Sequence, residues 1–245
     1  MNLLDLIGEP TPKKLGNRIL NFIIIVLLLM LAPIFIAVAS AVNVIWQQVL
    51  SIIVMIIAYS AVGYYAYRLL KKTANQPIFH RIDIRNWRHI WYIIGMFILM
   101  MVVQGVINNL RVAITGTSTT ENQAAIEALT KHINVAMIGT MIYGVLLAPV
   151  VEELIFRGLV INYFFRQSWW WASIILSGFL FAVPHTMNLS TNIADLLAFM
   201  IYMSMGMVLA YVYKKTGDIQ SNIMIHFLNN LISMIPLLFL ALSRI

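Results

Sequence analysis

The residues that could carry chemistry are concentrated in one segment, residues 150–158, which reads Val-Val-Glu-Glu-Leu-Ile-Phe-Arg-Gly. Ionisable residues within apolar stretches are costly and by default mark a functional site. On a helix, Glu153 and Arg157 are four residues apart and can form an ion pair, whereas Glu152 points about 100° away from Glu153. One arginine does not neutralise two buried carboxylates. Glu152 is therefore available for general base catalysis, and the alternative is an ion pair that only fixes helix packing.

Two further apolar stretches contain polar residues of the same kind. His185 ends the run Phe181-Ala182-Val183-Pro184-His185, and His226 and Asn230 share one helical face at i,i+4 spacing. A lone histidine in such a stretch is more often a packed, hydrogen-bonding residue than a catalyst. Two histidines, an asparagine and paired acids on three separate helices favour a common site.

These motifs resemble those of the CPBP membrane proteins, which include type II CAAX prenyl endopeptidases and Abi-type bacteriocin-processing or self-immunity proteins. The family's motifs are matched in order: Glu-Glu-x-x-x-Arg by Glu152, Glu153 and Arg157, Phe-x-x-x-His by Phe181 and His185, and His-x-x-x-Asn by His226 and Asn230. The run from Thr216 to Ile219 also looks like the family's Thr-Gly-x-Ile approach to the last motif. Each motif alone is weak, but the ordered set is specific. It covers roughly residues 150–230.

The resemblance implies an intramembrane endopeptidase, a peptidase and hydrolase of the membrane. Glu152 and His185 would hold and activate a water that attacks a peptide carbonyl. His226 and Asn230 would polarise that carbonyl and stabilise the oxyanion. The family includes enzymes interpreted as glutamate proteases and as metalloproteases, so the resemblance leaves both mechanisms open.

The supporting pair and the metal follow from the same resemblance. Glu153 and Arg157 would orient the motif helix. Glu152, His185 and His226 could ligate zinc, with water at the open position. No His-Glu-x-x-His motif is visible, and we expect no obligatory zinc or other cofactor.

The elements that must position these residues are membrane-spanning helices. Hydrophobic residues make up 61% of the chain and charged residues 10%, whereas soluble domains carry about 25% charged residues. Successive apolar stretches reach the roughly 20 residues that a span requires. The sequence therefore predicts an all-α, polytopic transmembrane bundle. The absence of cysteine excludes disulfides, thiolate metal sites and a cysteine nucleophile.

About seven spans are expected, with eight as the alternative. The predicted spans are 19–39, 44–67, 90–107, 133–151 with an extension, 169–184, 193–213 and 221–240. Lysine and arginine cluster in alternate connections, at Lys13 to Arg18, between residues 68 and 88, at Arg166, and at Lys214 and Lys215. The positive-inside rule puts these connections and the N-terminus in the cytoplasm. We expect a basic cytoplasmic segment over 1–18 and one transmembrane domain over 19–245.

Two geometric questions remain open from the sequence. Residues 133–165 would form a helix about 50 Å long at 1.5 Å per residue, against a hydrocarbon core of roughly 30 Å. The helix must be long and tilted, or interrupted near Pro149. His185 also lies about 24 Å from the start of its span and His226 only about 8 Å from its own. The two histidines can meet only if their spans are offset or tilted, or if Trp169 to Trp171 stands partly outside the hydrocarbon.

The partners follow from this reading. The expected substrate is a membrane-embedded or membrane-associated protein or peptide, such as a CAAX-like protein, a bacteriocin precursor or a signalling-peptide precursor. The basic connections suit anionic lipid, and no nucleic-acid partner is expected. The plasma membrane of a bacterium is the expected location. The alternatives are a proton-coupled transporter, because intramembrane acids and histidines also form proton relays, and a non-catalytic self-immunity or scaffold protein.

Overall fold

The computed structural model describes residues 10–75, 77–80, 87–131, 133–165, 169–186 and 192–243, without the side chains of Trp87 and Arg88. Within these ranges the chain forms helices and no strand, which confirms the predicted all-α class. Part of the predicted N-terminal segment, residues 1–9, lies outside the described residues. So do Arg81, Arg85 and Arg166. The cytoplasmic location of the N-terminus stays a prediction.

The described helices follow one another in a fixed order along the chain. They are α2 (Leu15–Leu29), α3 (Ala32–Ala41), α4 (Ile45–Lys71), α5 (Trp87–Thr115), α6 (Glu121–Leu129), α7 (Val135–Met141), the π-helical η1 (Ile142–Leu147), α8 (Ala148–Glu152), the π-helical η2 (Glu153–Leu159) and η3 (Ile161–Phe165), α9 (Trp170–Ala182), the 3-10 turn η4 (Val183–His185), α10 (Ile193–Thr216) and α11 (Ile219–Leu242).

Six stretches of the described residues are long and apolar enough to cross a membrane. They are Leu15–Ala41, Ile45–Lys71, His89–Thr115, Val135–Phe165, Ile193–Thr216 and Ile219–Leu242. The predicted span at 169–184 is present as the shorter apolar helix Trp170–His185. The polytopic bundle is thus confirmed, with one span shorter than the others.

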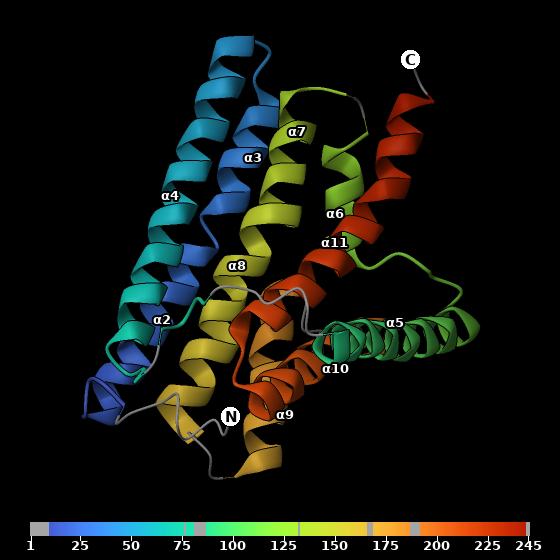
Figure 1. Ribbon diagram of the computed structural model, residues 1–245. Coiled ribbons are helices and arrows are strands. Elements are labelled where there is room, and N and C mark those ends of the chain that lie inside the picture. The colour runs from blue at the N-terminus through green and yellow to red at the C-terminus, as the bar shows by residue number, and fades with distance from the viewer. Residues whose placement is uncertain are drawn as a thin grey trace.

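A proline interrupts the first span. α2 ends at Leu29 and α3 begins at Ala32, with Pro33 in the first turn of α3. Proline lacks a backbone N–H and clashes with the preceding turn, so it is tolerated at a helix start but not in the interior. The span is therefore two helices that follow one another (Figure 1).

The fourth span answers the question about Pro149. Val135–Phe165 is continuously helical over 31 residues, and Pro149 lies in the first turn of α8, directly after the π-helical η1. The wider π turns absorb the hydrogen bond that proline cannot make. The continuous alternative is confirmed, and the π turns η1 and η2 lie on either side of Glu152.

The helices near the site do not all run in one direction. In Figure 1, α3, α4 and α7 run roughly from the bottom to the top of the picture and α11 slants upward, whereas α5 runs across it. α10 packs most extensively against α9 and α5. Gly206 of α10 lies against Gly178 of α9, and a Cβ added to Gly206 would stand 2.7 Å from the Cα of Gly178. The two backbones meet at these glycines.

We predict that Gly206→Ala destabilises the protein by about 1–3 kcal/mol, because the added methyl must push α9 and α10 apart. The same substitution at Gly105 of α5 is the control, since a Cβ there meets nothing within 4 Å. Alanine favours a helix over glycine by up to about 1 kcal/mol. The free energy of unfolding of both variants is measured by denaturant unfolding in detergent micelles. If both alanines stabilised the protein equally, the close approach of α9 and α10 at Gly206 would be contradicted.

Candidate active site

Three of the four predicted catalytic residues meet at one carboxylate oxygen. The Nε2 atom of His185 lies 3.8 Å from Oε2 of Glu152, and Nε2 of His226 lies 3.9 Å from the same oxygen. Glu152 ends α8, His185 ends η4 and His226 lies in α11. The three side chains thus come together from separate helices. The rings of Phe181, near the end of α9, and His226, in the first half of α11, have their centres 5.7 Å apart, so the end of one helix lies beside the first part of the other.

The carboxylate of Glu153 belongs to a fully buried network of polar side chains. Its Oε1 atom lies 3.0 Å from Nη1 of Arg157 and 2.9 Å from Nδ1 of His226. Its Oε2 atom accepts a hydrogen bond of 3.3 Å from the amide of Asn222. Glu153 and Arg157 both have 0% side-chain exposure. The structure therefore joins the predicted supporting pair to one of the predicted catalytic residues, His226.

Arg157 links the motif helix to two others. Its Nη2 atom donates to the carbonyl of Gly206 at 3.3 Å, and its guanidinium carbon lies 4.4 Å from the ring centre of Phe181. The Phe181 ring also stands edge-on to His226 and lies 4.5 Å from the ring of His185. The phenylalanine of the second motif thus packs against the arginine and both histidines.

The hydrogen bonds of the two histidines fix which nitrogens face Glu152. Nδ1 of His185 lies 2.7 Å from the carbonyl oxygen of Phe181. A carbonyl only accepts, so Nδ1 carries the proton, and Nε2 of the neutral ring is an acceptor. Nδ1 of His226 likewise donates to the carboxylate of Glu153. Each ring therefore turns its Nε2 toward Glu152.

Asn230 lies one helical turn beyond His226 and has different contacts. Its amide nitrogen donates to the carbonyl of Gly144 at 2.7 Å, and its oxygen accepts from Asn229 at 3.1 Å. Among the hydrogen bonds of the described residues, none joins Asn230 to the other predicted catalytic side chains. Its catalytic role stays a prediction.

Sequence reasoning missed several polar residues around the two acids. Asn222 is fully buried and also donates to the carbonyl of Leu209 at 2.6 Å. Its position four residues before His226 is a signal that extends the same polar face of the helix. Tyr59 of α4 and Tyr143 of η1 interact electrostatically with Glu152. They lie in segments without a motif, so nothing in the sequence marks them.

Lys214 also differs from its expected place among the solvated charges. Its side chain is buried, and Nζ donates to Ser173 at 2.8 Å and lies 4.9 Å from the ring centre of Trp170. Lys214 is therefore packed among protein groups of α9. Its ammonium helps to fix the start of α9 against the end of α10.

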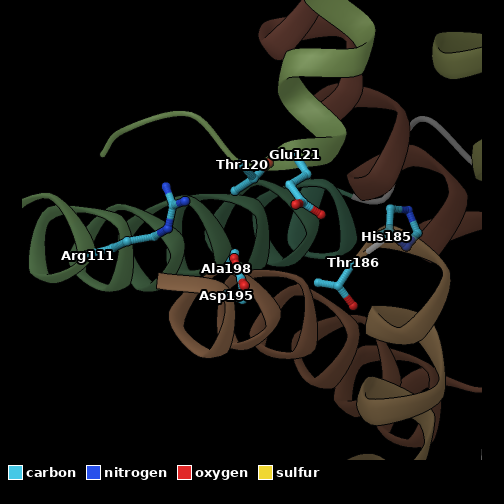
Figure 2. A pocket seen from close by; sticks show the side chains of 7 residues that line it. All are labelled: Arg111, Thr120, Glu121, His185, Thr186, Asp195 and Ala198. Carbon is cyan, nitrogen blue, oxygen red and sulfur yellow. The ribbon is translucent and has the colours of Figure 1, made fainter. Parts of the chain in front are cut away.

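A small polar pocket reaches His185 from the side of α5 and α6 (Figure 2). It has room for about one water molecule, with a volume of about 10 Å³. Its walls are Arg111, Thr120, Glu121, His185, Thr186, Asp195 and Ala198. Arg111 shapes the pocket through hydrogen bonds to the carbonyls of Ala194, Thr117 and Thr119. The pocket therefore reaches one of the predicted catalytic residues, His185.

The donor set around Glu152 contains the groups that zinc takes, one carboxylate and two imidazoles. Among the residues that the structure describes, no group of three or more His, Cys, Asp or Glu has the geometry to hold a metal ion. The separations of 3.8 and 3.9 Å exceed the roughly 3.3 Å between neighbouring ligands that zinc bonds of about 2.0–2.1 Å imply. Zinc would require the three side chains to move inward.

The comparison with known proteins covers the part of the chain that contains this site. Residues 134–232 match the family described as type II CAAX prenyl endopeptidase Rce1-like. This segment is similar to that family. It includes all four predicted catalytic residues and confirms the resemblance to the CPBP membrane proteases. The match supports a membrane endopeptidase of the CAAX type in general.

A curated relative agrees with the family match. The chain is 26% identical over 142 residues to the Bacillus subtilis (strain 168) protein named "Putative membrane peptidase YdiL". This match covers 58% of the chain and spans about half, 53%, of the relative. No solved structure matches significantly. The Rce1-like domain and the apolar helices identify an integral membrane protein, and the bacterial relative agrees with the predicted plasma membrane.

We predict that Arg157→Leu costs about 3–5 kcal/mol of stability, because it leaves the Glu153 carboxylate buried without its ion-pair partner. The double variant Glu153→Gln with Arg157→Leu recovers part of that loss, because the uncompensated charge is removed. Arg68→Leu, at an exposed position on α4, serves as the control. Thermal unfolding of purified protein measures all three, and a double variant no more stable than Arg157→Leu would contradict the ion-pair account.

Proposed function

We propose that the Rce1-like domain is the catalytic part of a membrane endopeptidase that cleaves a membrane-associated protein or peptide. The observation that supports this most directly is the convergence of Glu152, His185 and His226. Both imidazoles turn Nε2 toward one carboxylate oxygen, at 3.8 and 3.9 Å. Such separations have room for a bridging water.

The proposed reaction begins with water held by Glu152 and His185. The Glu152 carboxylate takes a proton from the water as general base, and the water oxygen attacks the carbonyl carbon of the scissile bond. A new C–O bond forms, and the π electrons of the carbonyl move to its oxygen to give a tetrahedral oxyanion. Collapse of this intermediate breaks the C–N bond. The proton held by Glu152 passes to the leaving nitrogen.

His226 and Asn230 stabilise the oxyanion in this proposal. Because Nδ1 of His226 donates to Glu153, Nε2 can donate to an oxyanion only when the ring is doubly protonated. The Glu153 carboxylate faces such an imidazolium and stabilises its charge. The NH₂ group of Asn230 has two hydrogens to donate. The carbonyl of Gly144 accepts one of them, and the other donates to the oxyanion.

The substrate class follows from the surroundings of the site. The catalytic residues lie within apolar helices, so the scissile bond must be presented from the membrane or its surface. The peptide must be extended or locally unwound, because a helical peptide bond is closed to attack by its own hydrogen bonds. A CAAX-like protein, a bacteriocin precursor or a signalling-peptide precursor meets these conditions. Comparison of the membrane peptidome with and without the gene identifies the substrate and supplies a reporter peptide.

We predict that Glu152→Gln abolishes cleavage of that reporter peptide, with a loss of at least about 100-fold, because glutamine cannot take the proton of the water. Folding and the level in the membrane remain unchanged, since the amide has the size of the carboxyl group. The control is Glu127→Gln, at an exposed position on α6. Full processing by Glu152→Gln would refute the catalytic assignment and favour a non-catalytic scaffold or self-immunity protein.

We predict that activity survives dialysis against a strong chelator, because the donor atoms around Glu152 are more widely spaced than zinc ligands. Reporter cleavage before and after dialysis is the measurement, with the metal content of the purified protein determined in parallel. Loss of activity that stoichiometric zinc restores would assign Glu152, His185 and His226 as zinc ligands instead.

A further inference from the structure

Tyr59 places a hydroxyl group beside the acid that the reaction uses. It lies in α4, has 1% exposure and interacts electrostatically with Glu152 and Tyr143. The rings of Tyr59 and Tyr143 stand edge to face, with centres 5.0 Å apart. This packing fixes the direction of the Tyr59 ring, so the hydroxyl is held in place and not free to turn toward lipid.

Several buried polar atoms in this region have no hydrogen bond of normal geometry within the described part of the chain. Besides Nε and Nη1 of Arg157 and Oδ1 of Asn222, they include the hydroxyl of Tyr59, which lies close enough to Glu152 to interact with its carboxylate, and Oε2 of Glu152, the same oxygen toward which His185 and His226 turn. A buried polar atom without a partner costs about 1–3 kcal/mol. A small polar molecule that hydrogen-bonds to the Tyr59 hydroxyl and to Oε2 of Glu152 relieves that cost, which makes the space between them a favourable place for the reacting water.

A water molecule has two donors and two lone pairs, and the residues present match this set. Oε2 of Glu152 accepts one hydrogen, and Nε2 of the neutral His185 ring accepts the other. One lone pair must remain free to attack the carbonyl carbon. The second lone pair needs a donor. The hydroxyl of Tyr59 is a donor, whereas neither Glu152 as a carboxylate nor Nε2 of His185 can donate.

We infer that Tyr59 is a further catalytic residue, whose hydroxyl donates to the second lone pair of the attacking water and so directs the first lone pair at the scissile carbonyl. Tyr59 keeps its own proton throughout, because Glu152 receives the proton that the water releases. This inference rests on the proposed endopeptidase function and adds a residue from α4, outside the matched Rce1-like segment. It also implies that the residues 134–232 alone do not contain the complete site.

The test is Tyr59→Phe, which removes the hydroxyl and retains the ring packed against Tyr143. We expect kcat for the reporter peptide to fall by about 10- to 100-fold, as for loss of one group that positions the reacting water. KM stays within about twofold, because the hydroxyl contacts water and not the peptide. The activity of each variant is measured at a temperature well below the midpoint of its own thermal unfolding, so that unfolded protein does not lower the apparent kcat.

The matched control is Tyr163→Phe. The hydroxyl of Tyr163 is also buried without a hydrogen-bond partner among the described residues, but it lies 11 residues after Glu152, about 16 Å further along the helix. Tyr163→Phe therefore has unchanged kcat. An equal fall in both variants would show a general packing effect and overturn the inference.

The remaining outcomes separate this inference from the proposed function. If Glu152→Gln is inactive and Tyr59→Phe retains full kcat, the role of Tyr59 is refuted and the endopeptidase stands. If Tyr59→Phe raises KM and leaves kcat unchanged, Tyr59 contacts the substrate and not the water, which also refutes the inference. If Glu152→Gln remains active, the proposed function itself fails.

Discussion

The structure of the site depends on one buried ion pair. Glu153 and Arg157 lie 3.0 Å apart with no exposed side-chain surface, where an unpaired charge would be prohibitively costly. The Glu153 carboxylate also accepts from Asn222 and His226 of α11, and Nη2 of Arg157 donates to the carbonyl of Gly206 of α10. The charge requirement of one helix is thus met by groups from two others. This requirement orients His226 and brings the histidine helix to the acid helix.

The adjacent acids can have separate roles because their polar contacts differ. Glu153 takes up the arginine, the amide and one histidine nitrogen, while Oε2 of Glu152 stays without a hydrogen-bond partner among the described residues. The π-helical turns on either side of α8 change the angular spacing of side chains relative to a regular α-helix. Stability and chemistry are in this way divided between neighbouring residues of one sequence motif.

Much of the fold and of the acid–histidine cluster could be predicted, because those features leave a local signal. Apolar length marks the spans, and the i,i+4 spacing of Glu153 and Arg157 marks the ion pair. Tyr59 could not be predicted, since a tyrosine in an apolar helix is common and its meaning depends on which helix lies opposite. The same holds for the burial of Lys214, which depends on Ser173 and Trp170 in a different span. The π turns also leave no pattern that distinguishes them from a long regular helix with a proline.

The shortest apolar helix has a consequence for the surrounding lipid. α9 has 13 residues and η4 has 3. Together they are about 25 Å long, which is less than the roughly 30 Å thickness of the hydrocarbon core. A segment with this hydrophobic mismatch makes the bilayer thin around it or draws its flanking groups inward. His185 ends that segment. The depth to which an aqueous phase must penetrate to reach the histidine therefore depends on the thickness of the bilayer beside this segment, and so on the lipid composition of the membrane.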